Sequence, residues 1–386
     1  MKNLNCRIKK TSLLIFRLSL LLLLTNCSNI DETTIKDVED DVIQITDPWI
    51  CEMQSFEETD YGYKLYLEDN GDYIAVSNTR MLKVSKDGTL DAIHLMNTSD
   101  EDIDHVKIHN NKIYRFHYEN FTYDLAQPIK LQIYDFDLTL LSEHILDAYG
   151  AFADAKFESD NQFVLLENNP DDNIMTFKKL NLTDGLISEI VLSTDHSTHP
   201  TEILILENGD YLCAGRSTYF VDNSLNNTSE LEIDFIKRIS GAKYISGQGI
   251  YVTGSSNSVN FENESFVTLL DLDGNEINSI LYDAGERGNL TRMEINHERI
   301  CLIQGEPESG KNLLFSILDY DLNIESTMDI VGGHVGSDII LNEIGSFSFV
   351  YGIAIDPDNP EWDAPANTRI FKFDDSYTLP TNIIIQ

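Results

Sequence analysis

AKYISGQGIYVTGSSNSVNFENESFVTLLDLDGNEINSILYD, residues 242–283, is the stretch that decides the fold of this chain. It holds four short runs rich in aliphatic, aromatic and β-branched residues, and clusters of Gly, Asn, Asp and Ser separate them. Runs of this composition between turn-forming residues are typical of consecutive antiparallel strands. The stretch therefore predicts a small four-stranded sheet.

The same unit recurs along the chain. In each copy, an apolar residue that follows a small polar turn marks the second strand. These residues lie 39 to 50 positions apart and are Tyr73, Ile113, Phe163, Tyr211, Ile250, Ile300 and Phe347. Four-stranded repeats of this length are typical of a β-propeller.

A second, independent marker is the turn after the third strand of each unit. It falls at Asp87, Asp137, Asp184, Ser224, Asp273, Asp321 and Asp374, with spacings of 40 to 53 residues. Both markers give seven units. The sequence thus predicts an all-β fold over residues 48–386, a seven-bladed β-propeller of four-stranded antiparallel blades, with six or eight blades or two β-sandwiches as alternatives.

The patterning of the strands favours the propeller over the sandwiches. Second strands such as 347–351 are apolar on both faces, as expected for strands covered on both sides. Fourth strands such as 276–281 alternate between apolar and polar residues, which suits the outer edge of a blade. Two sandwiches would show alternation in most of their strands.

The N-terminal segment has the features of an export signal. Residues 1–26 carry five basic and no acidic residues, and the apolar run 18–24 is too short to span a bilayer. The sequence Leu24-Thr25-Asn26-Cys27 resembles the lipobox of bacterial lipoproteins, which implies lipidation of Cys27. An ordinary cysteine beside a signal-peptidase site is the alternative.

Residues 27–47 follow as an acidic segment with few aromatic residues, which predicts an extended tether between the lipid and the folded part. Acyl chains on Cys27 would attach the protein stably to a membrane without spanning it. Ser28 stands where aspartate would resemble an inner-membrane retention signal, so we expect the outer membrane or the cell surface.

The charge of the chain excludes one class of partner. The chain has 27 basic and 65 acidic residues, a net charge of −38, and 22 basic residues remain once the five of the signal are removed. Such a field repels nucleic acid and anionic lipid surfaces. We therefore expect no nucleic-acid partner.

The cysteines indicate neither zinc binding nor redox chemistry. Beyond Cys6 and Cys27, the chain has only Cys51, Cys213 and Cys301, with no CxxC spacing among them. We expect these three to be buried free thiols.

Candidate ligand-binding residues come from the loops that crowd on one face of a propeller, which join the fourth strand to the next first strand and the second to the third. Arginines and histidines gather in these loops although the chain is acidic. A guanidinium group matches the geometry of a carboxylate, so we expect an acidic glycan or peptide as ligand. The alternative is that loops hold most polar residues in any fold. The candidates are His105, Tyr149, His199, Arg216, Arg238, Arg287, His334 and Trp362.

No motif indicates a cofactor or a catalytic centre. The acidic loops 168–173 and 356–363 could each bind calcium, whereas Asp271–Glu276 lacks the ligand spacing of a calcium loop and is expected to be a hairpin turn. His196 and His199 would form a metal site only with a third ligand from another unit. Apart from calcium at those loops we expect no cofactor.

Part of the chain resembles the repeats of bacterial envelope β-propeller lipoproteins. The resemblance rests on residues 247–256 (GQGIYVTGSS) and 266–275 (FVTLLDLDGN), with similar residues at 208–215 (NGDYLCAG) and 70–76 (NGDYIAV). It implies a largely uncharacterised family and carries over no catalytic residue.

These observations together predict a lipid-anchored envelope protein that acts as a non-catalytic binding or scaffolding propeller. Its expected partners are the membrane, through the lipid, and a glycan or another envelope protein. A glycan hydrolase or lyase acting at the channel face is the rival hypothesis, and an assembly subunit is a third.

Overall fold

The computed structural model describes the propeller region of the chain. The described residues are 49–53, 64–77, 80–95, 105–117, 128–149, 151–169, 174–193, 200–231, 236–256, 264–283, 290–296, 298–305, 313–330, 333–342, 345–354, 366–373 and 383–385. They all belong to one compact unit, residues 46–386. The predicted signal, Cys27 and the tether lie outside the described residues.

Within these ranges, 29 β-strands and no helix are found, and the strands form seven sheets. Their bounds are β1(Trp49–Met53), β2(Lys64–Leu67), β3(Tyr73–Val76), β4(Arg80–Val84), β5(Leu90–Leu95), β6(His105–His109), β7(Lys112–His117), β8(Pro128–Tyr134), β9(Leu140–Tyr149), β10(Ala151–Ser159), β11(Gln162–Asn169), β12(Ile174–Asn181), β13(Gly185–Ser193), β14(Pro200–Ile205), β15(Tyr211–Gly215), β16(Thr218–Val221), β17(Thr228–Leu231), β18(Ile236–Ile245), β19(Gly249–Ser256), β20(Glu264–Leu270), β21(Glu276–Asp283), β22(Leu290–Ile295), β23(Ile300–Gly305), β24(Leu313–Leu318), β25(Ile324–Ile330), β26(Gly333–Leu341), β27(Phe347–Ala354), β28(Ala366–Lys372) and β29(Ile383–Ile385).

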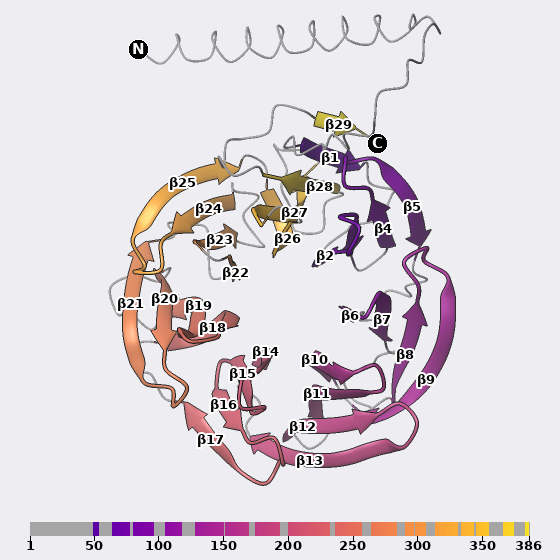
Figure 1. The fold of residues 1–386 in the computed structure, drawn as a ribbon, viewed down its shortest axis with the longest axis vertical. Coiled ribbons are helices and arrows are strands. Elements are labelled where there is room, and N and C mark those ends of the chain that lie inside the picture. The colour runs from indigo at the N-terminus through magenta and orange to yellow at the C-terminus, as the bar shows by residue number, and fades with distance from the viewer. Residues whose placement is uncertain are drawn as a thin grey trace, which may run out of the picture. The chain divides into compact units, whose positions relative to one another are not determined.

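The seven sheets stand in a ring, so the chain is a seven-bladed β-propeller, as the sequence predicts (Figure 1). Residues from the innermost strands of all seven sheets line a central channel. Blades 1 to 6 are β2–β5, β6–β9, β10–β13, β14–β17, β18–β21 and β22–β25, each with its strands in chain order from the channel outward. All seven predicted second-strand markers, Tyr73 to Phe347, lie in second strands. The six described markers of the following turn lie between third and fourth strands.

Both ends of the propeller chain meet in blade 7, whose order is β26-β27-β28-β1-β29. Strand β1 pairs antiparallel with β28, with Cys51 opposite Ile370, and β29 pairs parallel with the outer side of β1. In Figure 1, indigo β1 accordingly lies beside gold β28 and β29. The N-terminal strand therefore closes the ring, and the C-terminal strand covers its edge.

Each blade buries its faces against its two neighbours. The buried apolar side chains form seven clusters, one at each boundary between blades. At the closure, for example, Trp49 packs edge-on against Tyr73 of blade 1, with ring centroids 5.6 Å apart. Second strands such as β15 and β19 are buried along their whole length, while outer strand β5 alternates. A single blade could not cover these faces, so the ring is the folding unit.

A recurrent aspartate shapes the turns between third and fourth strands. The carboxylate of Asp271 accepts hydrogen bonds from the backbone N–H groups of Asp273 and Asn275, at 2.9 and 2.8 Å. The same aspartate turn begins at Asp135, Asp222 and Asp319. These bonds explain why acidic residues recur there, and they confirm that Asp271–Glu276 is a hairpin turn.

One residue in each of these turns adopts the left-handed backbone conformation. Blades 1, 3 and 5 place glycine there, but blades 2, 4 and 6 place Leu138, Leu225 and Leu322, with φ of 61°, 55° and 66°. The three leucines are buried in the clusters between blades. Burial of the side chain thus offsets the steric cost of this conformation for a residue with a Cβ atom.

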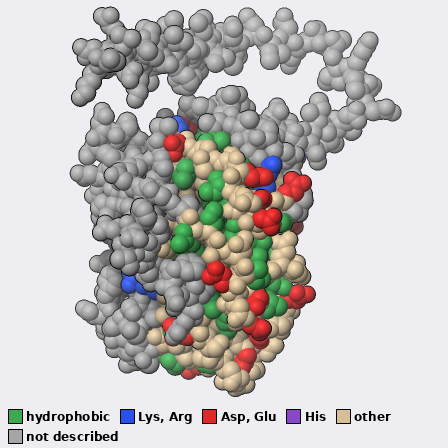
Figure 2. Space-filling view, turned by 90° about the vertical axis from the view of Figure 1, so that its left-hand side faces the viewer, with side chains coloured by type: hydrophobic (Ala, Val, Ile, Leu, Met, Phe, Trp, Pro, Cys, Tyr) green, Lys and Arg blue, Asp and Glu red, His purple; other side chains and the backbone are tan. Residues whose placement is uncertain are grey.

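The outer surface is acidic. The side of the molecule in Figure 2 shows Asp and Glu scattered over it and few Lys or Arg, in keeping with the net charge of −38. The three predicted thiols, Cys51, Cys213 and Cys301, are buried and free, and burial raises the pKa of Cys51 to about 12. None of the described segments is a helix long and apolar enough to cross a membrane.

Candidate functional site: the channel and its loop end

The first strands of all seven blades line the channel. Their pairing with the second strands places two levels of side chains around it. The first level is Lys64, His105, Asp154, Glu202, Gly241, Arg292 and Asp338, each opposite the third residue after a second-strand marker. The second level, two residues further along each strand, is Tyr66, Lys107, Lys156, Leu204, Lys243, Glu294 and Ile340.

The two ends of the channel differ in their connections. At one end, here called the loop end, lie the connections from second to third strands and from each blade to the next. At the other, the turn end, lie the short turns that join first to second and third to fourth strands. First strands run from the loop end to the turn end, so the first level of side chains lies nearer the loop end.

Carboxylates on the first level satisfy backbone groups of the next blade. Asp154 accepts the N–H of Ile203 at 2.7 Å, and Glu202 accepts the N–H of Ala242 at 2.9 Å. Asp338 does the same for Leu65 at 3.1 Å, across the closure of the ring. The innermost strand of a blade has one unpaired edge, and these carboxylates satisfy donors that this edge would otherwise leave open.

Cations of neighbouring blades pair with the same acids. Lys107 contacts Asp154, and Lys64 lies 3.8 Å from Asp338. Burial alone would raise the pKa of Asp154, but Lys107, Lys156 and the Ile203 N–H hold it below its usual value. Asp154 therefore remains ionised and takes part in joining the blades.

The pKa of Lys64 is also lowered, which for an amine favours the neutral form. Asp338 raises its pKa, but burial and the charges of Arg292 and Lys107 outweigh that effect and lower the pKa to about 8. The amine is thus partly neutral at mildly alkaline pH.

Polar contacts also join blades 5 and 6 at the channel. Lys243 pairs with Glu294 at 2.9 Å, and Arg292 donates to the backbone oxygen of Ser240 at 2.7 Å. The Glu294 carboxylate counteracts the burial of Lys243 and raises the pKa of that amine. The charges on this side of the channel are therefore fixed in place.

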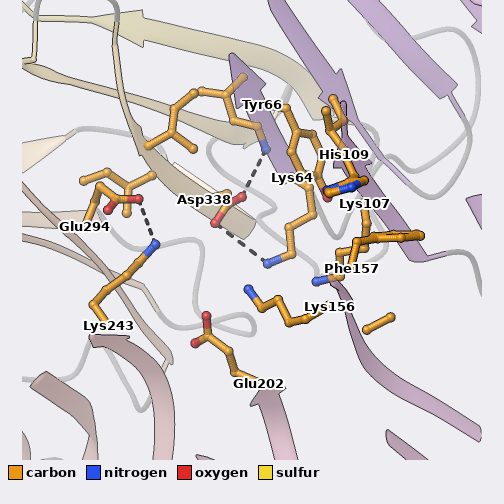
Figure 3. Close-up of a pocket in the computed structure, with 15 residues that line it drawn as sticks. Lys64, Tyr66, Lys107, His109, Lys156, Phe157, Glu202, Lys243, Glu294 and Asp338 are labelled. Carbon is orange, nitrogen blue, oxygen red and sulfur yellow. Dashed lines mark hydrogen bonds and ion pairs between the residues drawn. The ribbon is translucent and has the colours of Figure 1, made fainter. Parts of the chain in front are cut away.

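The channel widens into a cavity of about 330 Å³ that residues from all seven first strands line (Figure 3). It extends to His109 and Phe157 near the turn end, and the His109 ring stacks on Phe157 at 5.0 Å. A smaller cavity of about 70 Å³ shares several lining residues and reaches Arg292 and Asp154. The cavities lie in the middle of the ring, where first strands meet.

Three arginines from successive blades gather toward the loop end. Arg216 follows β15, Arg238 is the third residue of β18, and Arg292 lies on β22. Burial, and then the charges of Arg216 and Arg292, lower the pKa of Arg238. The Arg238 Nε atom is buried and has no hydrogen-bond partner in the described part of the chain. Arg216 and Arg238 were both among the candidates predicted from the sequence, whereas Arg292 was not.

The other predicted site residues are spread around the ring. His105 is the first residue of β6, and burial lowers its pKa to about 3. Tyr149 ends β9 on the outer edge of blade 2, where its N–H donates to Glu167 at 2.9 Å. His334 lies on β26 opposite Gly352. Outside the described residues are His199, Arg287 and Trp362, and also His196 and the loops 170–173 and 356–363.

Sequence reasoning missed the charged lining of the channel. The first-level residues lie eight or nine positions before the second-strand markers, so the repeat itself could have located them. Their residue type changes from blade to blade, as with Lys64, Asp154 and Arg292, and no motif drew attention to them. The residues missed were Lys64, Lys107, Lys156, Lys243, Asp154, Glu202, Glu294, Arg292 and Asp338.

In the described ranges, no group of three His, Cys, Asp or Glu residues could hold a metal ion. The channel carboxylates Asp154, Glu202 and Asp338 accept backbone N–H groups, and Glu294 pairs with Lys243. What the channel can do chemically is to bind charged groups by complementary charge.

Comparison with known proteins identifies the fold but no family. No family model matches the chain, and no curated protein matches it. Among solved structures, it is similar to a catalytically inactive virginiamycin B lyase from Staphylococcus aureus with quinupristin, at 11% identity and TM-score 0.56, covering 84% of this chain and 99% of that chain.

A second similar structure is the WD40 β-propeller domain of Doa1, at 10% identity and TM-score 0.55, covering 84% of this chain and 96% of that one. A third is a chain of the mitotic checkpoint complex, at 14% identity and TM-score 0.55, covering 90% and 98%. An enzyme and a WD40 domain are both among these neighbours, so the similarity shows the β-propeller fold alone.

Proposed function

We propose that this chain is a non-catalytic binding propeller whose ligand is a carboxylated molecule, an acidic glycan or peptide, held by arginines at the loop end of the channel. The observation that carries the proposal is the gathering of Arg216, Arg238 and Arg292 from three successive blades, with the Arg238 Nε atom buried and without a hydrogen-bond partner among the described residues.

A bound carboxylate would compensate the charge of this arginine cluster. The buried Nε atom of Arg238 lacks an acceptor among the described residues, which is unfavourable, and two further guanidinium groups nearby add repulsion. A carboxylate placed among them would supply acceptors in the geometry that guanidinium groups match, and it would relieve the repulsion. Because the rest of the chain is so acidic, such an anion would be held only where the cations gather.

The second part of the proposal concerns the place where the protein acts. We infer from the lipobox-like sequence that Cys27 carries lipid and that residues 27–47 tether the propeller to the outer membrane or the cell surface. A tethered binding propeller would hold envelope glycans or proteins near the membrane.

The binding proposal is tested with the full chain and its Arg216→Gln, Arg238→Gln and double variants. Each is applied to an array of uronic-acid-containing glycans, neutral glycans and carboxylated peptides. We expect the wild type to bind acidic members and the double variant to lose roughly tenfold or more in affinity. Arg299→Gln is the matched control, because Arg299 precedes β23 at the turn end and pairs with Glu325 at 3.0 Å.

Equal binding by the double variant and the wild type would overturn the arginine site. Incubation of the same glycans with the wild type, followed by mass spectrometry, tests the rival enzyme class, and shortened or unsaturated products would favour it. The anchor is tested separately. Cys27→Ser should move the protein from the membrane fraction to the soluble fraction, and unchanged fractionation would refute lipid attachment at this residue.

A further inference from the structure

Two charged side chains of the central cavity have no ion-pair partner within 4 Å in the described part of the chain. The other lysines and carboxylates of its lining have ion-pair partners: Lys64 with Asp338, Lys243 with Glu294, and Lys107 with Asp154, which lines the smaller cavity. Lys156 and Glu202 remain, and both line the cavity. Figure 3 shows both side chains extending toward its open centre, with no bond drawn from either.

These two residues come from adjacent blades. Lys156 lies on β10 of blade 3 and Glu202 on β14 of blade 4, and both are half-buried. The Oε2 atom of Glu202 accepts the Ala242 N–H at 2.9 Å, which fixes the carboxylate, while its other oxygen remains available as an acceptor. The cavity therefore presents an ammonium group and a carboxylate from adjacent blades, neither of them within 4 Å of an opposite charge among the described residues.

We propose that the channel cavity is a binding site for a small zwitterion, such as a free amino acid or a short peptide. Lys156 pairs with the carboxylate of the ligand, and Glu202 accepts from its ammonium group. The site adjoins the loop-end arginines, since Glu202 and Arg292 both line the smaller cavity, but it goes beyond the carboxylate binding proposed there because it also requires an ammonium group.

The balance of charge in the lining favours a zwitterion over a simple anion. The lining of the larger cavity holds four lysines and three carboxylates, so an anion near Lys156 would also lie near Glu202. A ligand with both charges satisfies both residues, and each pair is charge-assisted in a partly desolvated site. A cavity of about 330 Å³ is at the small end of ligand pockets.

The apolar part of the wall indicates which side groups the ligand could carry. Tyr66 and Phe157 line the cavity, and Phe157 is held by the stacked ring of His109. The Tyr66 hydroxyl donates to the backbone oxygen of Val106, so its aromatic ring is fixed in place. Aromatic walls of this kind favour an apolar or aromatic side group.

The test is isothermal titration of the full chain with glycine, alanine, phenylalanine and dialanine, and with the N-acetyl and amide derivatives of phenylalanine. We expect the zwitterions to bind and each derivative, which lacks one charge, to bind roughly tenfold or more weakly. Lys156→Gln should abolish the preference for phenylalanine over its amide. Glu202→Gln should abolish the preference over the N-acetyl derivative.

Several variants keep the result interpretable. Lys156→Arg retains the charge and should retain binding, and Lys112→Gln on the second strand β7 should leave it unchanged. In Arg238→Gln, the preference for phenylalanine over its N-acetyl derivative should persist, because the loop-end arginines would bind a carboxylate with or without an ammonium group beside it. Thermal melting confirms that each variant folds. The proposal is overturned if no zwitterion binds, or if Lys156→Gln and Glu202→Gln bind all ligands as the wild type does.

Discussion

The carboxylate of Asp154 accepts a hydrogen bond from the backbone N–H of Ile203 at 2.7 Å, across the boundary between blades 3 and 4. The same carboxylate contacts Lys107 of blade 2, so one side chain joins three blades at the wall of the channel. Equivalent carboxylates, Glu202 and Asp338, join two further boundaries. Charge in the channel thus has a structural role.

Removing the Asp154 carboxylate should weaken the ring. Asp154→Ala leaves the Ile203 N–H without an acceptor and Lys107 without its partner, so we expect a loss of about 2–4 kcal/mol in the free energy of unfolding. Urea titration measures this loss. Asp91→Ala on the exposed face of outer strand β5 is the control and should change stability by less than about 0.5 kcal/mol. Equal stability of Asp154→Ala and the wild type would contradict the structural role.

His105 should make the protein sensitive to acid. Its folded pKa of about 3 lies below the ordinary value of 6.5, so the unfolded state binds a proton that the folded state does not. The contribution of His105 to stability therefore falls as the pH falls from 6.5 toward 3. In urea titrations at several pH values, His105→Gln should become progressively more stable relative to the wild type over that range. A constant difference between the two proteins would refute the buried neutral state.

Lys64 should titrate near pH 8. After reductive ¹³C-methylation, we expect one lysine signal with a midpoint close to 8, absent in Lys64→Arg, against an ordinary value of 10.5. Asp338→Asn removes the charge that raises this pKa and should lower the midpoint further. Because the folded pKa is below the unfolded one, the contribution of Lys64 to stability should rise between pH 8 and 10.5. A midpoint above 10 would contradict this picture.

At Leu322, a glycine variant should be more stable than an alanine variant, which is the reverse of the usual order. Leu322 is 2% exposed and has a φ of 66°, so Leu322→Ala loses packing and keeps the strained backbone, at a cost of about 2–4 kcal/mol. Leu322→Gly loses the same packing but relieves roughly 1 kcal/mol of steric strain. In thermal and urea unfolding, Leu322→Gly should therefore be more stable than Leu322→Ala. Leu318, buried in β24, is the control position, and there Leu318→Gly should be less stable than Leu318→Ala.

The closure of the ring should depend on Glu52 of β1. Its carboxylate accepts from Arg369 at 2.8 and 2.6 Å and from Asn367 at 2.9 Å, both on β28. We expect Glu52→Ala to cost about 1–3 kcal/mol in urea titration, since these donors lose their acceptor. In Glu52→Ala, the backbone amides of β1 should exchange their hydrogens faster than those of the other blades. Uniform exchange in all blades would show instead that the ring opens elsewhere.

The sequence predicts the fold far better than the site. Markers such as Tyr211 and Ile250 stand out because second strands are covered on both faces, and burial leaves a dense apolar run. First strands carry no such constraint, since their side chains meet neighbours that differ from blade to blade. Lys64 and Asp338 contact each other although 274 positions separate them, and only the closed ring brings them together.

The conformation of the turns between third and fourth strands is also hard to predict from the sequence. The sequence predicts the turns at Asp137, Ser224 and Asp321, but it gives no reason to place a leucine in the left-handed conformation one residue later. That leucine is tolerated because a neighbouring blade provides an apolar space for it, which local patterning does not reveal. The arginine cluster could be predicted in part: Arg216 and Arg238 were expected because arginines gather in the loops of an acidic chain, but Arg292 was not.

The placement of β1 has a mechanical consequence. Whatever precedes Trp49 is attached to the strand that fastens the ring, and this strand is held by β28 on one side and β29 on the other. Tension along the leading segment would load these two ladders in shear, many hydrogen bonds at once. The propeller should therefore resist stretching from that end, and when it yields, blade 7 should come apart first.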